Sequence, residues 1–316
     1  MIFIKYLSVF FLFKFKIYKI SLQHTINQKL IIILTTTITN SILTAEIKHT
    51  GAELFSLKNN SSKEYIWEGD PAFWGKHSPI LFPIVGTLKN NSYQYNGKEY
   101  QLSRHGFARE MDFELIDKKE NSATFSLKSS NETTKKYPFD FELQLTYTLE
   151  NKSLKIEYKV INNGMAQMPF SIGAHPAFAL RGNFEDYSLE FEDEKPLDYF
   201  LLDDGLISDT TATLQLNKKQ LHLNYKLFEN DALVFKTISS KSLTILENSN
   251  PILKVNYEGF PNLGIWTPQD APFICIEPWF GYSDTATNFG NLFEKEGIQI
   301  LDVNAVFNSE FSIIII

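Results

Sequence analysis

From residue 38 onward the chain alternates apolar and polar residues over short runs, separated by Asn, Gly, Asp and Lys. A period of two is that of a β-strand with one buried face. Two such runs flank residues 150–153, and a second pair turns at Asn96-Gly97, so both read as hairpins. Helical periodicity longer than two turns is hard to find. The pattern predicts an all-β protein, a large antiparallel β-sandwich of two packed sheets.

The chain is long enough for one large domain. It has 316 residues, 43% of them hydrophobic, with 27 Phe and 14 Tyr that suit the faces of sheets. No internal repeat and no Pro/Gly/Ser-rich linker divides it. We therefore expect a single β-sandwich domain over residues 38–316, preceded by an extension over residues 1–37.

The extension is apolar and aromatic but is broken by lysines, and its longest uncharged run, residues 6–13, is far shorter than the roughly 20 residues that span a bilayer. One interpretation is a misassigned start, with the functional chain beginning near residue 34 or 35. The other is a weak secretory segment, although no convincing cleavage site follows. We favour a cytoplasmic protein, with secretion as the alternative.

Charge and cysteine content exclude several classes of function. The net charge of -7 argues against a nucleic-acid partner, and the sequence predicts no membrane partner either. The lone Cys275 excludes an intramolecular disulfide and a cysteine zinc site.

Two short stretches carry candidates for proton chemistry. His175 lies in the apolar run FSIGAHPAFAL, where a histidine packed in the core is the commoner alternative. Glu277 interrupts APFICIEPWFGYSD, and a buried carboxylate is costly unless it is paired or used. A structural salt bridge is one explanation of Glu277. The other explanation is that Glu277 contacts a ligand. The aromatic residues that follow it, beginning with Trp279, favour this explanation, because a sugar ring can rest on them.

Four further residues are candidates for binding. His105 and Arg109 lie in LSRHGFARE, which is either a site or a basic surface loop. Asp231 precedes an apolar strand but also suits a turn with Asn230. His77, before a Ser-Pro, either caps a turn or lines a cleft.

Five blocks occur in the order found in a known family: SPILFPIVGTLKNNSYQYNGKEYQLSRHGFARE, FSIGAHPAFAL, NDALVFK, GIWTP and APFICIEPWFGYSD. Together they resemble the aldose 1-epimerase (galactose mutarotase-like) superfamily, most closely its LacX-type branch, over roughly residues 38–308. The resemblance implies a β-supersandwich isomerase that binds carbohydrate and interconverts the α and β anomers of an aldohexose. It implies neither cofactor nor metal.

The resemblance also implies roles. His175 would be the general acid that protonates the ring oxygen, and Glu277 the general base that takes the proton of the C1 hydroxyl. We expect their proximity to raise the pKa of the imidazolium and to keep the carboxylate charged. His105 would polarise the ring-oxygen side and Asp231 would hold hydroxyls, with Arg109, Trp279 and His77 as further substrate contacts.

One position departs from the family pattern, since Thr87 stands where an arginine is frequent. This puts the identity of the substrate in question, with Lys89 or Arg104 as compensating groups. A hexose-6-phosphate 1-epimerase is the alternative within the enzymes, because Arg104, Arg109, Lys76 and Lys89 could hold a phosphate. A non-catalytic sugar-binding or regulatory protein is the alternative of another class. Monomer and homodimer both stay open.

Overall fold

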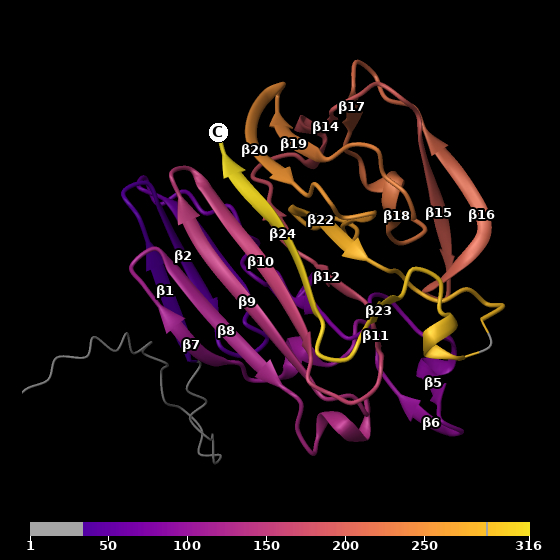
Figure 1. Cartoon of the computed structure of the whole chain (residues 1–316). Helices are drawn as coiled ribbons and strands as arrows, with labels where there is room; N and C mark the ends of the chain where they lie inside the picture. The colour runs from indigo at the N-terminus through magenta and orange to yellow at the C-terminus, as the bar shows by residue number, and fades with distance from the viewer. Residues whose placement is uncertain (1–33, 289) are drawn as a thin grey trace, which may run out of the picture. The chain divides into compact units, whose positions relative to one another are not determined.

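Two large antiparallel sheets organise the computed structural model, which describes residues 34–288 and 290–316 (Figure 1). The first has nine strands, ordered β17-β14-β19-β20-β24-β10-β9-β8-β7. The sequence predicts the hairpin β9–β10 correctly, with Glu150 opposite Ser153, and β9 buries every second residue. In chain order the strands are β7 Glu114–Lys118, β8 Ser122–Lys128, β9 Phe141–Glu150, β10 Ser153–Asn162, β14 Tyr187–Phe191, β17 Gln220–His222, β19 Ser242–Glu247, β20 Asn250–Asn256 and β24 Val306–Ile315.

The second sheet has eight strands and carries the residues of interest. Its order is β16-β15-β18-β21-β22-β12-β4, and β13 also pairs with β22. β22 is buried along nearly its whole length, as a central strand is. The strands are β4 Ile80–Leu81, β12 Ile172–Ala174, β13 Ala177–Ala179, β15 Leu197–Asp203, β16 Leu206–Leu214, β18 Leu233–Phe235, β21 Asn262–Trp266 and β22 Phe273–Phe280.

Three small sheets and short 3-10 helices complete the described chain, in which no α-helix occurs. The hairpin β5–β6 turns at Asn96 and Gly97, both at positive φ, as their sequence predicts. The small sheets are β1 Thr35–Thr39 with β2 Leu43–Lys48 and β3 Leu54–Asn59, β5 Ser92–Tyr95 with β6 Lys98–Gln101, and β11 Met168–Phe170 with β23 Gln299–Leu301. The helices are η1 Lys89–Asn91, η2 Ala108–Glu110, η3 Thr133–Lys135, η4 Phe184–Asp186, η5 Tyr225–Phe228 and η6 Leu292–Glu294.

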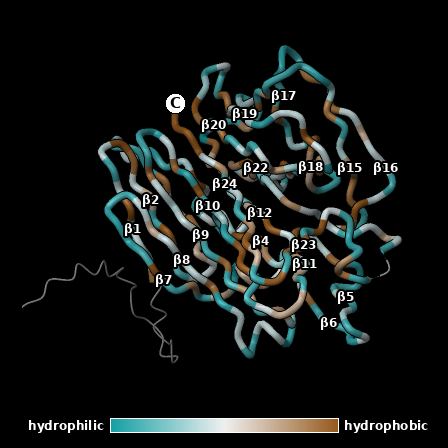
Figure 2. Tube along the Cα trace, in the orientation of Figure 1, coloured by the Kyte–Doolittle hydropathy of each residue, from teal (hydrophilic) through white to brown (hydrophobic). Residues whose placement is uncertain are grey.

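Aromatic side chains fill the space between the two large sheets. Phe280 of β22 packs edge-on against Phe307 of β24, with ring centroids 4.9 Å apart. The apolar C-terminus is a core strand, since Ile313 and Ile315 of β24 are buried, and Figure 2 shows its hydrophobic end in brown. The predicted fold class, an antiparallel all-β sandwich, is confirmed.

The predictions for the extension fall mostly on residues 1–33, which lie outside the described residues, and they stay predictions. β1 begins at Thr35, so the first strand starts inside the predicted extension over residues 1–37. Within residues 34–288 and 290–316, no helix has the length and apolar content needed to cross a bilayer.

Candidate active site

The central strand β22 positions Glu277 and Trp279 on one face, because they lie two residues apart. Gly264 of β21 lies opposite Glu277, and Gly173 of β12 lies opposite Trp279. On the same side of β22, β12 ends at Ala174 and β13 resumes the pairing at Ala177. His175 stands in the gap between these two strands, at the level of Glu277.

A cavity of about 390 Å³ opens above these residues. It collects most of the residues that the sequence singles out, and five Trp, Tyr and Phe side chains contribute to its wall. The lining residues are Trp74, Gly86, Arg104, His105, Arg109, His175, Leu202, Phe228, Asp231, Ala232, Val234, Trp266, Thr267, Pro268, Glu277, Trp279, Tyr282 and Ser283.

His175 and Glu277 form a pair at the buried end of this cavity. The Nε2 atom of His175 lies 3.2 Å from Oε2 of Glu277, and the two residues are 7% and 1% exposed. Trp74 stacks on the imidazole, with centroids 4.7 Å apart and an angle of 25° between the planes. His175 Nδ1 and Glu277 Oε2 have no hydrogen-bond partner among the described residues. A bound ligand could satisfy both atoms.

Burial dominates the electrostatics of the pair. It lowers the pKa of His175 to about 3, with Arg104 and Arg109 adding to the effect. It raises the pKa of Glu277 well above the ordinary value, against the opposing charge of Arg104. The expectation of a raised imidazolium pKa is therefore wrong, because loss of water penalises both charged forms more than pairing helps them. Burial favours neutral imidazole beside a protonated carboxyl.

His105 is held in one tautomer by the backbone. The ring atom Nδ1 of His105 accepts a hydrogen bond of 3.1 Å from the backbone N–H of Gly86. The backbone N–H of His105 donates to the Gly86 carbonyl at 2.8 Å. Since Nδ1 is an acceptor, the ring proton must lie on Nε2. Burial, and then the charge of His175, lowers the pKa of His105 well below its usual value. His105 is thus a neutral donor at the cavity wall.

The loop that carries Gly86 is anchored from the C-terminal part of the chain. Ser283 Oγ accepts the N–H of Thr87 at 2.9 Å, and Asp284 accepts the N–H of Lys89 at 2.9 Å. Asp284 in turn lies 3.4 Å from Nζ of Lys295, and both side chains are almost fully buried. Gly86 has a φ of +72°, and a Cβ there would lie 2.1 Å from Ser283 Oγ. The loop therefore needs glycine at this position.

Trp279 lies flat against the sheet between two glycines. A Cβ on Gly173 would lie 2.4 Å from its ring, and a Cβ on Gly264 would lie 2.3 Å from it. The indole N–H donates to the Ala174 carbonyl at 3.2 Å, next to His175. The glycines make room for a large aromatic floor beside Glu277.

Charged side chains line the outer part of the cavity. Arg104 Nη2 lies 3.5 Å from Asp231 Oδ2, and both side chains are partly exposed. Asp231 is at φ +76°, and one of its carboxylate oxygens accepts the N–H of Ala232. Arg109 donates to the Arg104 carbonyl at 2.9 Å and lies 3.6 Å from Glu110. The structure thus brings Arg109 and Asp231 to the same cavity as the pair.

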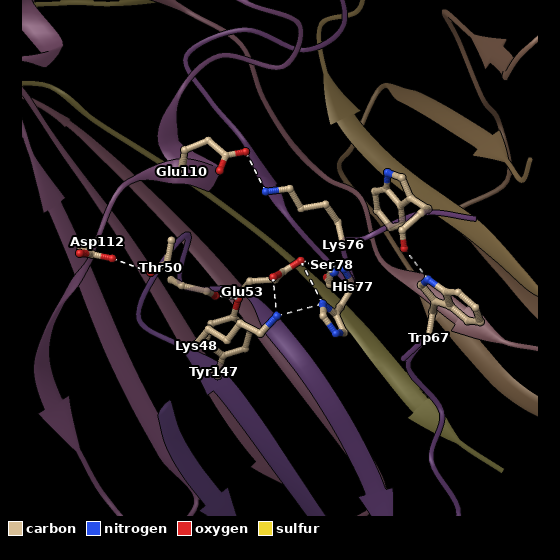
Figure 3. A network of polar contacts seen from close by, with 12 residues as sticks. Lys48, Thr50, Glu53, Trp67, Lys76, His77, Ser78, Glu110, Asp112 and Tyr147 are labelled. Carbon is tan, nitrogen blue, oxygen red and sulfur yellow. Dashed lines mark hydrogen bonds and ion pairs between the residues drawn. The ribbon is translucent and has the colours of Figure 1, made fainter. Parts of the chain in front are cut away.

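His77 is not among the residues that line the cavity within the described chain. Its Nδ1 atom lies 3.1 Å from Lys48 Nζ and 3.6 Å from Glu53 Oε1, in the network of Figure 3. The same carboxylate oxygen accepts the backbone N–H of His77 at 2.7 Å. Of the two roles that the sequence leaves open for His77, the structure favours that of holding a turn in place.

A set of possible metal ligands lies at the same end of the cavity. One donor atom each of His175, Cys275 and Glu277 lies within 4.8 Å of the others, and these donor types occur in zinc sites. Burial, and then the charge of Glu277, raises the pKa of the Cys275 thiol well above its usual value. In the absence of an ion the thiol is therefore protonated at neutral pH, and a metal would have to displace this proton in order to bind.

Trp74, which stacks on His175, is a site residue that the sequence motifs do not predict. Trp74 lies in the turn after Asp70, and the N–H of the Trp67 indole donates to its carbonyl at 2.8 Å. Aromatic content alone could not single it out among so many Phe, Tyr and Trp. From the sequence, Arg104 is predicted only as a phosphate ligand or as a group that compensates for Thr87. Its pairing with Asp231 is not predicted.

Known proteins resemble this chain over most of its length. The family model for aldose 1-epimerase matches residues 35–298. Protein LacX (plasmid) of Lactococcus lactis subsp. lactis is 39% identical over 273 residues, which cover 81% of this chain and 91% of LacX.

Two solved structures share both the fold and about a third of the sequence. A galactose mutarotase related enzyme from Lactobacillus acidophilus is 34% identical, with a TM-score of 0.86 over 90% of this chain and 97% of its own. A galactose mutarotase-like protein from Lactobacillus casei is 32% identical, with a TM-score of 0.83 over 89% of this chain and 100% of its own. The chain belongs to the aldose 1-epimerase family, in its LacX-type branch, and is an isomerase that acts on carbohydrates.

Proposed function

We propose that the protein interconverts the α and β anomers of a free aldohexose, with His175 and Glu277 as its acid and base. The observation that carries this proposal is the buried contact of 3.2 Å between an imidazole nitrogen and a carboxylate oxygen at the end of an open cavity. Burying two titratable groups together is costly, and the cost is understandable where they exchange protons with a ligand.

The chemistry needs one mobile proton on the pair. Glu277 takes the proton of the C1 hydroxyl while His175 gives its proton to the ring oxygen. The bond from C1 to the ring oxygen breaks and C1 becomes an aldehyde. Rotation about C1–C2 and the reverse transfers then give the other anomer, with no covalent intermediate and no net change of protons.

The pair changes from one tautomer to the other during ring opening. Imidazolium with carboxylate precedes ring opening, and neutral imidazole with protonated carboxyl follows it. Both states hold the same number of protons, so conversion needs only movement of protons through the sugar. Burial favours the second state in the empty site. A proton must therefore pass from Glu277 to His175, whose nearest side-chain atoms are 3.2 Å apart, before the pair can open a bound ring.

The remaining groups would position the sugar. His105 presents an Nε2–H donor whose direction the Gly86 hydrogen bond fixes, and it suits the ring oxygen or a hydroxyl next to it. Asp231 and Arg109 would bind hydroxyls further out, and Trp279 would support the apolar face of the ring.

Of the four cations proposed for a phosphate, Arg104 and Arg109 line the cavity, and the two lysines do not. Lys76 Nζ lies 2.7 Å from a Glu110 oxygen, and Lys89 Nζ lies 3.4 Å from the Asn288 carbonyl. Neither lysine is among the lining residues of the cavity in the described chain. This favours a free sugar over a hexose 6-phosphate.

The test is the rate of anomer exchange by NMR for glucose, galactose and glucose 6-phosphate. We expect exchange well above the buffer rate for at least one free sugar, and slower exchange for the phosphate. Exchange at the buffer rate for all three would leave a binding protein as the alternative. Faster exchange of the phosphate would favour a hexose-6-phosphate epimerase.

A further inference from the structure

A buried ion pair follows the last strand of the site, β22, along the chain. Lys295 Nζ lies 3.4 Å from Asp284 Oδ1, and each side chain is only 1% exposed. Neither residue is among those that line the cavity in the described chain, and the proposed proton transfers use neither. Taking two charges out of water is costly, and further hydrogen bonds must satisfy the groups. The other contacts of the pair therefore indicate what it does.

Asp284 is connected to the loop over residues 86–89 by its backbone and its side chain. The backbone N–H of Asp284 donates to the Thr87 carbonyl at 2.8 Å, and Oδ2 accepts the backbone N–H of Lys89 at 2.9 Å. Oδ1 accepts a hydrogen bond of 2.6 Å from Asn288 Nδ2 and also faces Lys295. Both oxygens are thus used as acceptors, which a carboxylate can provide and an amide cannot.

Lys295 fixes the segment that joins Asp284 to the cavity. Its Nζ atom donates to the Tyr282 carbonyl while it faces the Asp284 carboxylate. Tyr282 and Ser283 both line the cavity, and Ser283 Oγ accepts the backbone N–H of Thr87 at 2.9 Å. One buried ammonium group therefore holds both ends of the segment 282–284, and this segment holds the loop.

The same loop determines the direction of the His105 side chain. Gly86 donates its N–H to Nδ1 of His105 and accepts the backbone N–H of His105, at 3.1 and 2.8 Å. His105 has a φ of +68°, which residues other than glycine adopt rarely, so outside contacts must hold it there. A shift of the loop at Thr87 or Lys89 would move the N–H that fixes the tautomer of His105.

We propose that Asp284 and Lys295 are positioning residues for the reaction, which hold the loop 86–89 so that His105 presents its Nε2–H to the sugar. They touch no substrate and act through the backbone of Thr87, Lys89 and Gly86. This inference rests on the proposed function for the role of His105, and it extends the set of residues on which that function depends.

Two variants at Lys89 isolate the backbone contact. Lys89→Pro removes the N–H that Asp284 accepts, at the first residue of η1, where proline is tolerated. Leu88 before it has the extended backbone that proline requires. Lys89→Ala is the matched control, because it loses the same side chain and keeps the N–H. We expect Lys89→Pro to weaken calorimetric binding of glucose and galactose at least fivefold and to lower kcat/KM at least tenfold. Lys89→Ala should change both values less than twofold.

The tautomer of His105 is measured by NMR of protein labelled with ¹⁵N-histidine, with the signals assigned by their loss in His105→Gln. Wild type and Lys89→Ala should carry the ring proton on Nε2 alone. Lys89→Pro should show a mixture of the two tautomers. Asp284→Asn and Lys295→Met, which break the pair, should show the same mixture. Loss of stability alone leaves the native tautomer in the molecules that stay folded, so this signal separates positioning from stability.

Equal tautomer populations and equal binding in Lys89→Pro and Lys89→Ala would overturn the inference. A native His105 signal with unchanged binding in Asp284→Asn or Lys295→Met would overturn it as well. If neither of these two variants folds, the comparison at Lys89 decides. If no sugar exchanges faster than in buffer, the proposed function fails, while the His105 signal and the binding constants still test the positioning.

Discussion

The Nε2 atom of His175, in the gap between β12 and β13, lies 3.2 Å from the Oε2 atom of Glu277 on β22, and both residues are shielded from water. Burial lowers the pKa of the imidazole and raises that of the carboxyl. The two groups lie close enough for their titrations to be coupled, and burial favours the neutral form of each. The behaviour of the pair with pH should differ from that of a solvated histidine.

The first prediction concerns the acid limb of activity. A second proton enters the pair only near the lowered pKa of His175, about 3. We therefore expect kcat/KM for anomer exchange to stay constant from pH 7 down to about pH 5, since this parameter reports the free enzyme. Polarimetry with subtraction of the buffer rate measures it. A fall with a midpoint near the ordinary histidine value of about 6.5 would contradict this account of the pair.

The second prediction concerns the glycine that orients His105. Gly86→Ala should destabilise the protein and lower kcat/KM at least tenfold, because the new methyl group would overlap Ser283 and move the N–H that His105 accepts. Gly97→Ala is the control, since Gly97 also has φ +72° but no atom within 4 Å of a Cβ.

The control should cost about 1 kcal/mol of unfolding free energy through backbone strain alone and leave kcat/KM unchanged. Urea unfolding and anomer exchange measure the two effects. Equal loss of activity in both variants would show that the Gly86 contact does not orient His105.

The third prediction concerns the network of Lys48, Glu53 and His77 (Figure 3). Burial opposes ionisation of Glu53, but the hydrogen bonds of His77 and the charge of Lys48 outweigh it and lower its pKa to about 2. A lowered pKa in the folded state stabilises the protein above the unfolded value of about 4.5, and this contribution is lost as the pH falls from there towards 2.

Glu53→Gln should therefore lower the free energy of unfolding by roughly 2–3 kcal/mol at pH 7, and the difference from wild type should shrink below about pH 5. Urea unfolding at pH 7, 5 and 4 measures this. Glu185→Gln, at an exposed carboxylate, should change stability by less than about 0.5 kcal/mol at each pH. A Glu53→Gln effect that does not vary with pH would rule out this source of stability.

The strands and hairpins were predictable because their signals are local. The alternation in β9 and β10 and the Asn96-Gly97 turn both depend on neighbouring residues. The fold class and the residues that share the cavity were likewise predictable, the latter through blocks that resemble a family. The role of Trp74 was not predictable, because it stacks on His175, which lies between β12 and β13 about a hundred residues further along the chain.

The protonation states were also beyond the sequence. A sequence can suggest that His175 and Glu277 meet, but the sign of each pKa shift depends on how completely water is removed from both. The position of His77 depends in the same way on Lys48 and Glu53, whose strands and loops only the folded chain brings together.

The most direct test of the acid–base assignment is the rate of anomer exchange in Glu277→Gln and His175→Gln, measured by NMR with the best free aldose. Each variant keeps a polar side chain but cannot take part in the proton transfers. We expect kcat to fall by about 10²–10⁴ in each, with little further loss in the double variant because the two groups act as one unit. Exchange at the wild-type rate in either single variant, with the fold intact by circular dichroism, would contradict the account.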